Sequence, residues 1–222
     1  FSASAGTIIM SGTAKTITGT GTIAFSILQL NGTITTASNF SILTLLNVAG
    51  TFSASAGTAT FMGTSVLSGI ANLYNVNLNG TSLQLSATSV LGIANVTTIT
   101  AGTLNVTSTL PNTVNFNGTG AQSINPITYN NLIFSNGNTK TAAGGITVNG
   151  NITISASTIF AGGLYTYSIL GNWVNNGTFT PGSSTVQFTG TGNGTISGAT
   201  TFNILTINKS ATTTTVTLLN NI

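Results

Sequence analysis

The chain has 222 residues, of which 41% are hydrophobic, and three basic side chains, Lys15, Lys140 and Lys209, give it a formal net charge of +3. It contains no Asp, Glu, His or Cys, so it lacks the usual ligands of protein metal sites and the usual groups of acid–base and triad catalysis. We therefore predict no catalytic, cofactor-binding or metal-binding residue, and no enzymatic activity.

The composition argues against other partners as well. Nucleic acid binding needs many cations on one face, which three scattered lysines do not supply. No apolar run approaches the roughly eighteen residues of a membrane-spanning helix. Without cysteine there is no disulfide, so packing and backbone ladders must stabilise the fold. Lys209 and Ser210 are an example of a formal base–nucleophile pair, although a lysine in this setting is ordinarily a solvated side chain.

Four imperfect copies of one pattern run through the chain, with cores near residues 1–33, 52–80, 104–135 and 175–210. Each copy has a Thr, a short strand that ends on Phe or Met, a Gly, a second apolar strand, and a third strand that closes on Asn in three of the copies. FSASAGT occurs twice, at residues 1–7 and 52–58. Because residue 1 already lies inside a copy, no signal peptide is expected in this sequence, which reads as mature, processed or excerpted from a longer chain.

The segments between the copies also predict short strands. Residues 40–46 form a near-continuous apolar run, which indicates burial on both faces or a corner between sheets. Residues 83–85, 96–99 and 104–106 follow as short β segments. Pro111 and Pro126 belong in turns or at edges, because each removes a ladder donor. Asn149-Gly150 favours a tight turn, and Trp173 is interpreted as a packed core residue, with a ligand platform as the alternative.

We predict an all-β, right-handed parallel β-solenoid of about ten rungs with about twenty residues each, forming a single continuous array over residues 1–222. Tandem small β-sandwich modules are the alternative, because turn signals every eight to twelve residues or so fit both folds. The irregular inserts and the aligned Asn positions favour the solenoid. Asn31, Asn79 and Asn208 hold the same place in three copies, either as a ladder of stacked amides or through turn chemistry alone.

Covalent glycans are a predicted modification, because they would solubilise a surface with almost no charge. The composition alone would produce about as many sequons by chance. The Asn-x-Ser/Thr sequons lie at Asn31, Asn39, Asn79, Asn95, Asn105, Asn117, Asn151, Asn176, Asn193 and Asn208.

The segment GNWVNNGTFTPGSSTVQFTG, together with ISGATTFNILTINKS, spans most of residues 171–210. It resembles the β-strand repeats of very large secreted and surface-anchored proteins of bacteria and some archaea, which are adhesin-like chains built as parallel β-solenoids. The likeness is weaker over the third copy and weakest over residues 81–109, and the absence of acidic residues departs from the family. The resemblance implies an extracellular, non-enzymatic role in attachment or surface structure.

The main functional hypothesis is a structural subunit or segment of an extracellular fibre, stalk or sheath. The ends support head-to-tail assembly, because TLLN at residues 217–220 repeats TLLN at residues 44–47, which leads into the second FSASAGT. Identical copies or flanking repeats of the same protein are the predicted partners, since one long polypeptide would show the same continuity. The predicted assembly residues are Phe1, Ala3, Ala5, Leu218, Leu219 and Ile222.

The alternative hypothesis is a surface binding module that recognises a glycan, or less readily ice, through an exposed face rich in Thr and Asn. Thr16, Thr18, Thr20 and Thr22 form a Thr-x-Thr run in the first copy. Ice binding requires such a run at the same place on successive rungs, and the other copies do not repeat it.

Overall fold

The computed structural model describes residues 1–219, which form 25 β-strands and no helix. Strands pair in parallel with strands from the preceding and following turns of the chain. The fold is therefore a parallel β-solenoid of about 11 turns, as predicted. The alternative of tandem β-sandwich modules is wrong, because such modules are built from antiparallel sheets. The right-handed coil stays a prediction.

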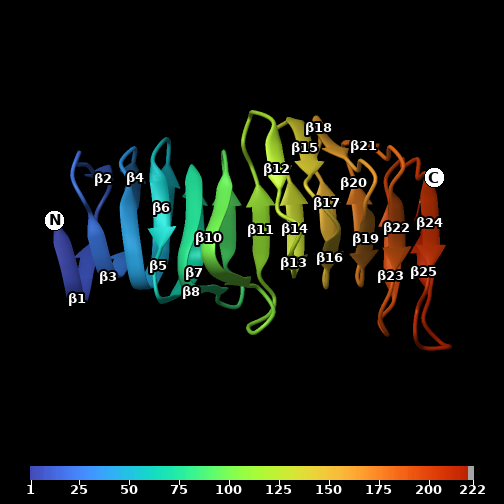
Figure 1. Cartoon of the computed structure of the whole chain (residues 1–222), viewed down its shortest axis with the longest axis horizontal. Coiled ribbons are helices and arrows are strands. Elements are labelled where there is room, and N and C mark those ends of the chain that lie inside the picture. Colours follow the sequence, from blue (N-terminus) through green and yellow to red (C-terminus); the bar gives the residue numbers. More distant parts are fainter. Residues whose placement is uncertain (220–222) are drawn as a thin grey trace. The chain divides into compact units, whose positions relative to one another are not determined.

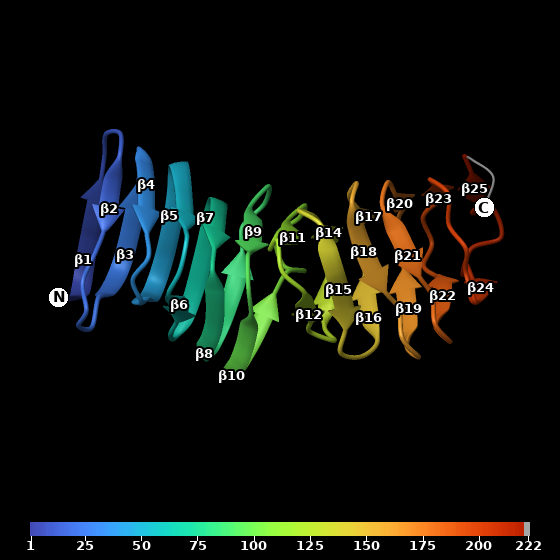
Figure 2. The same cartoon turned by 90° about the horizontal axis from the view of Figure 1, so that it is seen from above.

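Residue contacts divide the chain into two compact units, Phe1–Asn112 and Thr113–Ile222. The single continuous array over residues 1–222 stays a prediction. In Figure 1 and Figure 2, the strands of each unit lie side by side like rungs.

The first unit contains ten strands that stack turn upon turn. Among its parallel pairs are β1 with β3, β3 with β5, β5 with β7 and β7 with β9. The strands are β1 (Ser2–Met10), β2 (Lys15–Ile17), β3 (Ala24–Leu30), β4 (Thr33–Thr36), β5 (Phe40–Ala54), β6 (Thr58–Phe61), β7 (Thr64–Leu73), β8 (Asn75–Leu85), β9 (Val90–Ile93) and β10 (Thr97–Asn105).

The core of the first unit consists of columns of side chains in register on successive turns. One column holds Leu28, Leu46, Leu67 and Leu85, and none of the four has exposed surface. Every second residue of a strand points inward, so the residues between them face outward. Full burial of one such leucine contributes about 1.5–3 kcal/mol.

A β-bulge explains the apolar run at residues 40–46. Ile42 pairs with Phe25, whereas Leu45 pairs with Ile27, so β5 carries one more residue than β3 at this point. Ile42 and Leu46 are buried and Thr44 between them is exposed, so the inward face is interrupted at the bulge and Leu46 returns to the core. The run marks a local change of direction rather than a strand buried on both faces.

In the second unit each of the first four turns contributes one strand to each of three sheets. The sheets run β11-β14-β17-β20-β23-β25, β12-β15-β18-β21 and β13-β16-β19-β22-β24. The strands are β11 (Thr113–Phe116), β12 (Gln122–Ile124), β13 (Thr128–Tyr129), β14 (Asn131–Phe134), β15 (Asn138–Ala142), β16 (Ile146–Val148), β17 (Ile152–Ile154), β18 (Thr158–Ala161), β19 (Thr166–Ile169), β20 (Trp173–Asn175), β21 (Thr178–Thr180), β22 (Thr185–Phe188), β23 (Gly194–Ser197), β24 (Ile204–Ile207) and β25 (Val216–Leu218).

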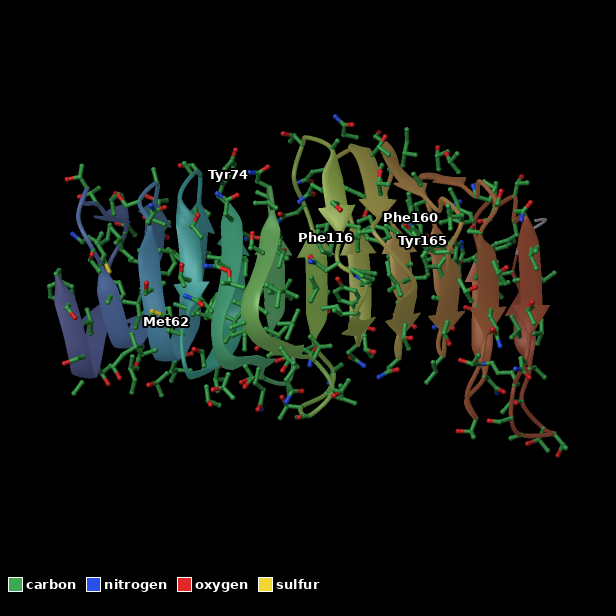
Figure 3. The ribbon with its side chains drawn as sticks, in the orientation of Figure 1. Met62, Tyr74, Phe116, Phe160 and Tyr165 are labelled. Atoms are coloured by element: carbon green, nitrogen blue, oxygen red, sulfur yellow. The ribbon has the colours of Figure 1, made fainter. Side chains whose placement is uncertain are left out.

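The core of the second unit is rich in aromatic side chains. Trp173 has no exposed surface, and its ring centroid lies 4.9 Å from that of Phe179 and 5.4 Å from that of Phe202. Its Nε1 donates to Thr200 Oγ1 at 3.3 Å, so the prediction of a core residue is confirmed. Phe160, labelled in Figure 3, is fully buried and contacts both Trp173 and Phe179.

The first and last strands of each sequence copy stack directly on one another. The residue that ends the first strand lies beside an apolar residue one turn later: Met10 beside Leu30, Phe61 beside Leu78, Phe116 beside Phe134, and Phe188 beside Ile207. The sequence pattern therefore records one full turn plus the strand that closes over it.

Glycines occupy corners at which successive turns approach closely. A Cβ atom at Gly50 would lie 2.1 Å from the carbonyl oxygen of Gly32, and one at Gly171 would lie 2.4 Å from that of Gly150. No side chain fits at these distances, so the stacking of turns itself requires glycine there.

Candidate binding and assembly surfaces

Lys140 of β15 points into the core and has no exposed surface. It lies in register between Gln122 and Phe160, and its Nζ donates to the carbonyl oxygens of Gly118 at 2.5 Å and Gly120 at 3.2 Å. Burial lowers the pKa of Lys140 to about 8. Sequence reasoning missed this role, although Lys140 stands two residues before the buried Ala142 and hence on the inward face of the strand.

Lys209 also acts on main-chain carbonyls. Its Nζ donates to the oxygen of Leu170 at 2.9 Å and to that of Thr189 at 2.7 Å, which belong to two earlier turns. Partial burial lowers its pKa. The Lys209 ammonium group therefore links its own turn to two earlier turns. This arrangement favours a structural role for Lys209 and its neighbour Ser210.

Of the two explanations offered for Asn31, Asn79 and Asn208, the amide ladder is wrong. Asn79 lies beside Ala101, whereas the backbone N–H groups of Asn31 and Asn208 donate to Met10 and Phe188 respectively. Each of the three asparagines directly follows the residue that closes over its own copy, but they do not lie on neighbouring turns, so their amides do not stack.

Asparagines form a ladder at a different corner, before the buried strands of the second unit. Asn131 Oδ1 accepts the backbone N–H of Asn151 at 2.9 Å, and Asn151 Oδ1 accepts that of Asn172 at 3.1 Å. Asn172 Oδ1 then accepts both the N–H and the hydroxyl of Thr195 at 2.9 Å. In the sequence, the signal for this ladder is an Asn beside an apolar strand once per turn, which is a shorter period than that of the four repeat copies.

The sequon asparagines are accessible in the structure. Asn105 and Asn117 are half-buried and the other eight are exposed. Asn39 and Asn193 each accept a backbone N–H from the next turn through Oδ1, at 2.8 and 3.0 Å. The predicted glycosylation stays a prediction at all ten positions.

The two ends of the chain expose apolar side chains. Phe1, Leu218 and Leu219 are 68%, 52% and 58% exposed. Ala3 is half-buried beside Phe25, and Ala5 is exposed. Ile222, also predicted at the assembly end, lies outside the described residues.

The Thr-x-Thr run does not follow one strand. Only Thr16 lies in a strand, β2, whereas Thr18, Thr20 and Thr22 belong to loop 18–23. Thr16 stacks on Thr35, with their Oγ1 atoms 3.4 Å apart. The loop residues instead help to form a hollow.

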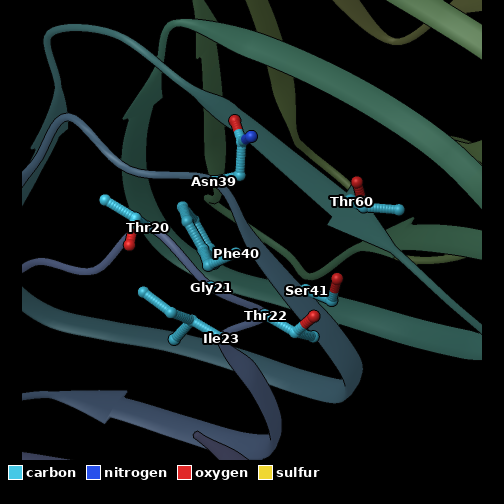
Figure 4. Close-up of a pocket in the computed structure, with 8 residues that line it drawn as sticks. All are labelled: Thr20, Gly21, Thr22, Ile23, Asn39, Phe40, Ser41 and Thr60. Carbon is cyan, nitrogen blue, oxygen red and sulfur yellow. The ribbon is translucent and has the colours of Figure 1, made fainter.

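That hollow, here called the corner groove, has a volume of about 420 Å³. Loop 18–23 joins β2 to β3 and is longer than the connection 37–39 that joins β4 to β5 one turn later. Figure 4 shows the residues around the hollow. The lining residues are Thr20, Gly21, Thr22, Ile23, Asn39, Phe40, Ser41 and Thr60.

The corner groove combines hydroxyl and amide groups with an apolar wall, and none of its lining residues is charged. Ile23 and Phe40 are 7% and 2% exposed and form the wall beneath the polar side chains. Asn39 is held in place because its Oδ1 accepts the Thr58 N–H at 2.8 Å.

No protein-family model, curated protein or solved structure matches this chain. Among residues 1–219 no helix is long and apolar enough to cross a membrane.

Proposed function

We propose that this chain is a structural segment of an extracellular fibre, stalk or sheath, whose rungs add head to tail through β-strand contacts. The observation that carries the proposal is the uncovered core at the last turns. Ile207 and Leu218 are each 52% exposed, whereas Phe188 and Ile196, the residues in register with them one turn earlier, have no exposed surface. One further β-rung would bury both.

The N-terminal end supports the same proposal. Residues 52–58 turn a corner that an earlier turn holds in place, because the Ser55 N–H donates to Thr36 O and the Thr58 N–H to Asn39 Oδ1. The identical residues 1–7 lie almost entirely within β1, whose one partner among residues 1–219 is β3. A preceding rung would supply these missing partners, and identical copies or flanking repeats of the same protein would provide it.

The likeness of residues 171–210 to repeats of adhesin-like surface proteins supports the extracellular setting. The outer surface is built from Thr, Ser, Asn and Gly, and the whole chain has only three charged side chains in 222 residues. Such a surface needs another source of solubility, and glycans on the exposed sequons would supply it. Such a segment needs strands that stack on neighbouring rungs, and it needs no catalytic turnover.

A charge at an open end tests the proposal. Lysine on a strand edge blocks pairing because its ammonium group would have to be buried. We expect Leu218→Lys to abolish filaments seen by electron microscopy of the concentrated chain. Leu164→Lys is the matched control, because Leu164 is 75% exposed and lies away from both ends, and it should leave filaments intact. Filaments that persist in Leu218→Lys would refute assembly through this end.

A further inference from the structure

We propose that the corner groove is a binding site for a neutral saccharide. The site goes beyond a structural role, and it depends only on residues within the first unit.

Three successive turns supply the polar groups of the groove. Ser41 and Thr60 are in register on adjacent strands, and both line the groove. Thr22 adds a third hydroxyl from the loop on the preceding turn. Each hydroxyl both donates and accepts, as do the hydroxyls of a sugar.

The uncharged lining of the corner groove restricts the class of ligand that it could bind. A phosphate or carboxylate ligand would be met by Arg or Lys side chains, and a hard cation by carboxylate oxygens. The groove has neither among its lining residues. Ile23 and Phe40 lie beneath the polar side chains and are almost fully buried, so hydroxyl and amide groups would supply most of the contacts to a ligand.

Two sources of saccharide fit this chemistry, namely an external glycan and a glycan attached to Asn39 itself. Asn39 is a sequon residue at the edge of the groove, and its Oδ1 is already engaged. Attachment would form a bond from Asn39 Nδ2 to the anomeric carbon of a lipid pyrophosphate-linked oligosaccharide, as the bond from that carbon to the pyrophosphate oxygen breaks and Nδ2 releases a proton. The experiment separates the two sources.

The test uses the full, unglycosylated chain titrated with cellotriose, maltotriose and chitotriose while amide NMR shifts are recorded. We expect shifts at the groove residues with at least one of the three. Thr22→Val combined with Thr60→Val removes two hydroxyls and should weaken binding about tenfold, since each hydrogen bond contributes about 0.5–1.5 kcal/mol. Thr98→Val is the control, because Thr98 lies in the same outward column two turns after Thr60.

Glycopeptide mass spectrometry of native material identifies the source. A glycan on Asn39, with free trisaccharide binding only after its enzymatic release, assigns the groove to the chain's own glycan. Binding with Asn39 bare assigns it to an external one. Absence of groove shifts with all three probes overturns the proposal, as does equal binding by the valine variants. Thr22→Val alone, in an exposed loop, provides the same comparison if the double variant does not fold.

Discussion

Lys140, Lys209 and two buried tyrosines determine how the stability of the chain depends on pH. Side-chain carboxylates and histidines are absent, so the free energy of unfolding should be nearly constant from acid to about pH 8. Burial lowers the pKa of Lys140 from 10.5 to about 8, so between these values the unfolded chain binds more protons than the folded chain and stability rises with pH. Burial raises the pKa of Tyr129 and Tyr167 above 10.0, so stability falls at higher pH.

Urea unfolding midpoints measured across this range check the prediction. We expect a flat midpoint in acid, a rise between about pH 8 and pH 10, and a fall beyond. Lys140→Met should reduce the rise and leave the part that Lys209 contributes, because burial lowers both pKa values. Lys15→Met should keep it, because Lys15 is exposed. A marked loss of stability between neutral and acidic pH would contradict the account.

The asparagine ladder allows a second test at the scale of one residue. Asn172→Ala removes the acceptor of both the Thr195 N–H and the Thr195 hydroxyl, and groups left unsatisfied at a half-buried corner cost roughly 1–3 kcal/mol. Asn208→Ala is the control, because Asn208 is exposed and follows the end of β24. Equal unfolding free energies for the two variants would show that the ladder does not stabilise the corner.

At the scale of elements, successive turns approach so closely at the glycine corners that a larger residue should destabilise the fold there. Gly171→Ala places a methyl group 2.4 Å from the Gly150 carbonyl oxygen, and such overpacking against backbone costs about 1–3 kcal/mol. Gly192→Ala has open space around the new methyl group and should be nearly neutral. Thermal unfolding of both variants measures the difference, and a neutral Gly171→Ala would mean that the turns separate easily.

Strand type was predictable from the sequence, but register was not. FSASAGT occurs twice, yet residues 1–7 lie mostly in β1 and residues 52–58 turn a corner between β5 and β6. The bulge in β5, where Leu45 pairs with Ile27, likewise moves later residues into other columns. Asn31, Asn79 and Asn208 are all exposed but do not lie on neighbouring turns, so they form no amide ladder although each segment was correctly expected to be β.

The whole fold was easier to predict than its surfaces. The repeated pattern captures one turn and its closing strand, and this periodicity indicates a solenoid without knowledge of any contact. The corner groove is different, because it unites Thr22, Ser41 and Thr60 from three turns and depends on the extra length of one loop. Lys140 was missed for a related reason, since only the inward phase of β15 reveals that the charge is buried.

Fibre diffraction from aligned native or concentrated material tests the central claim most directly. If the rungs continue from one chain to the next in the filament, the strands lie across the filament axis. A reflection at about 4.8 Å then falls on the meridian. We expect this reflection for the natural chain and for Leu164→Lys. In Leu218→Lys both the filaments and the reflection should be absent. A chain that stays monomeric at every concentration and whose native material contains no filaments would contradict it, as would filaments with that reflection on the equator.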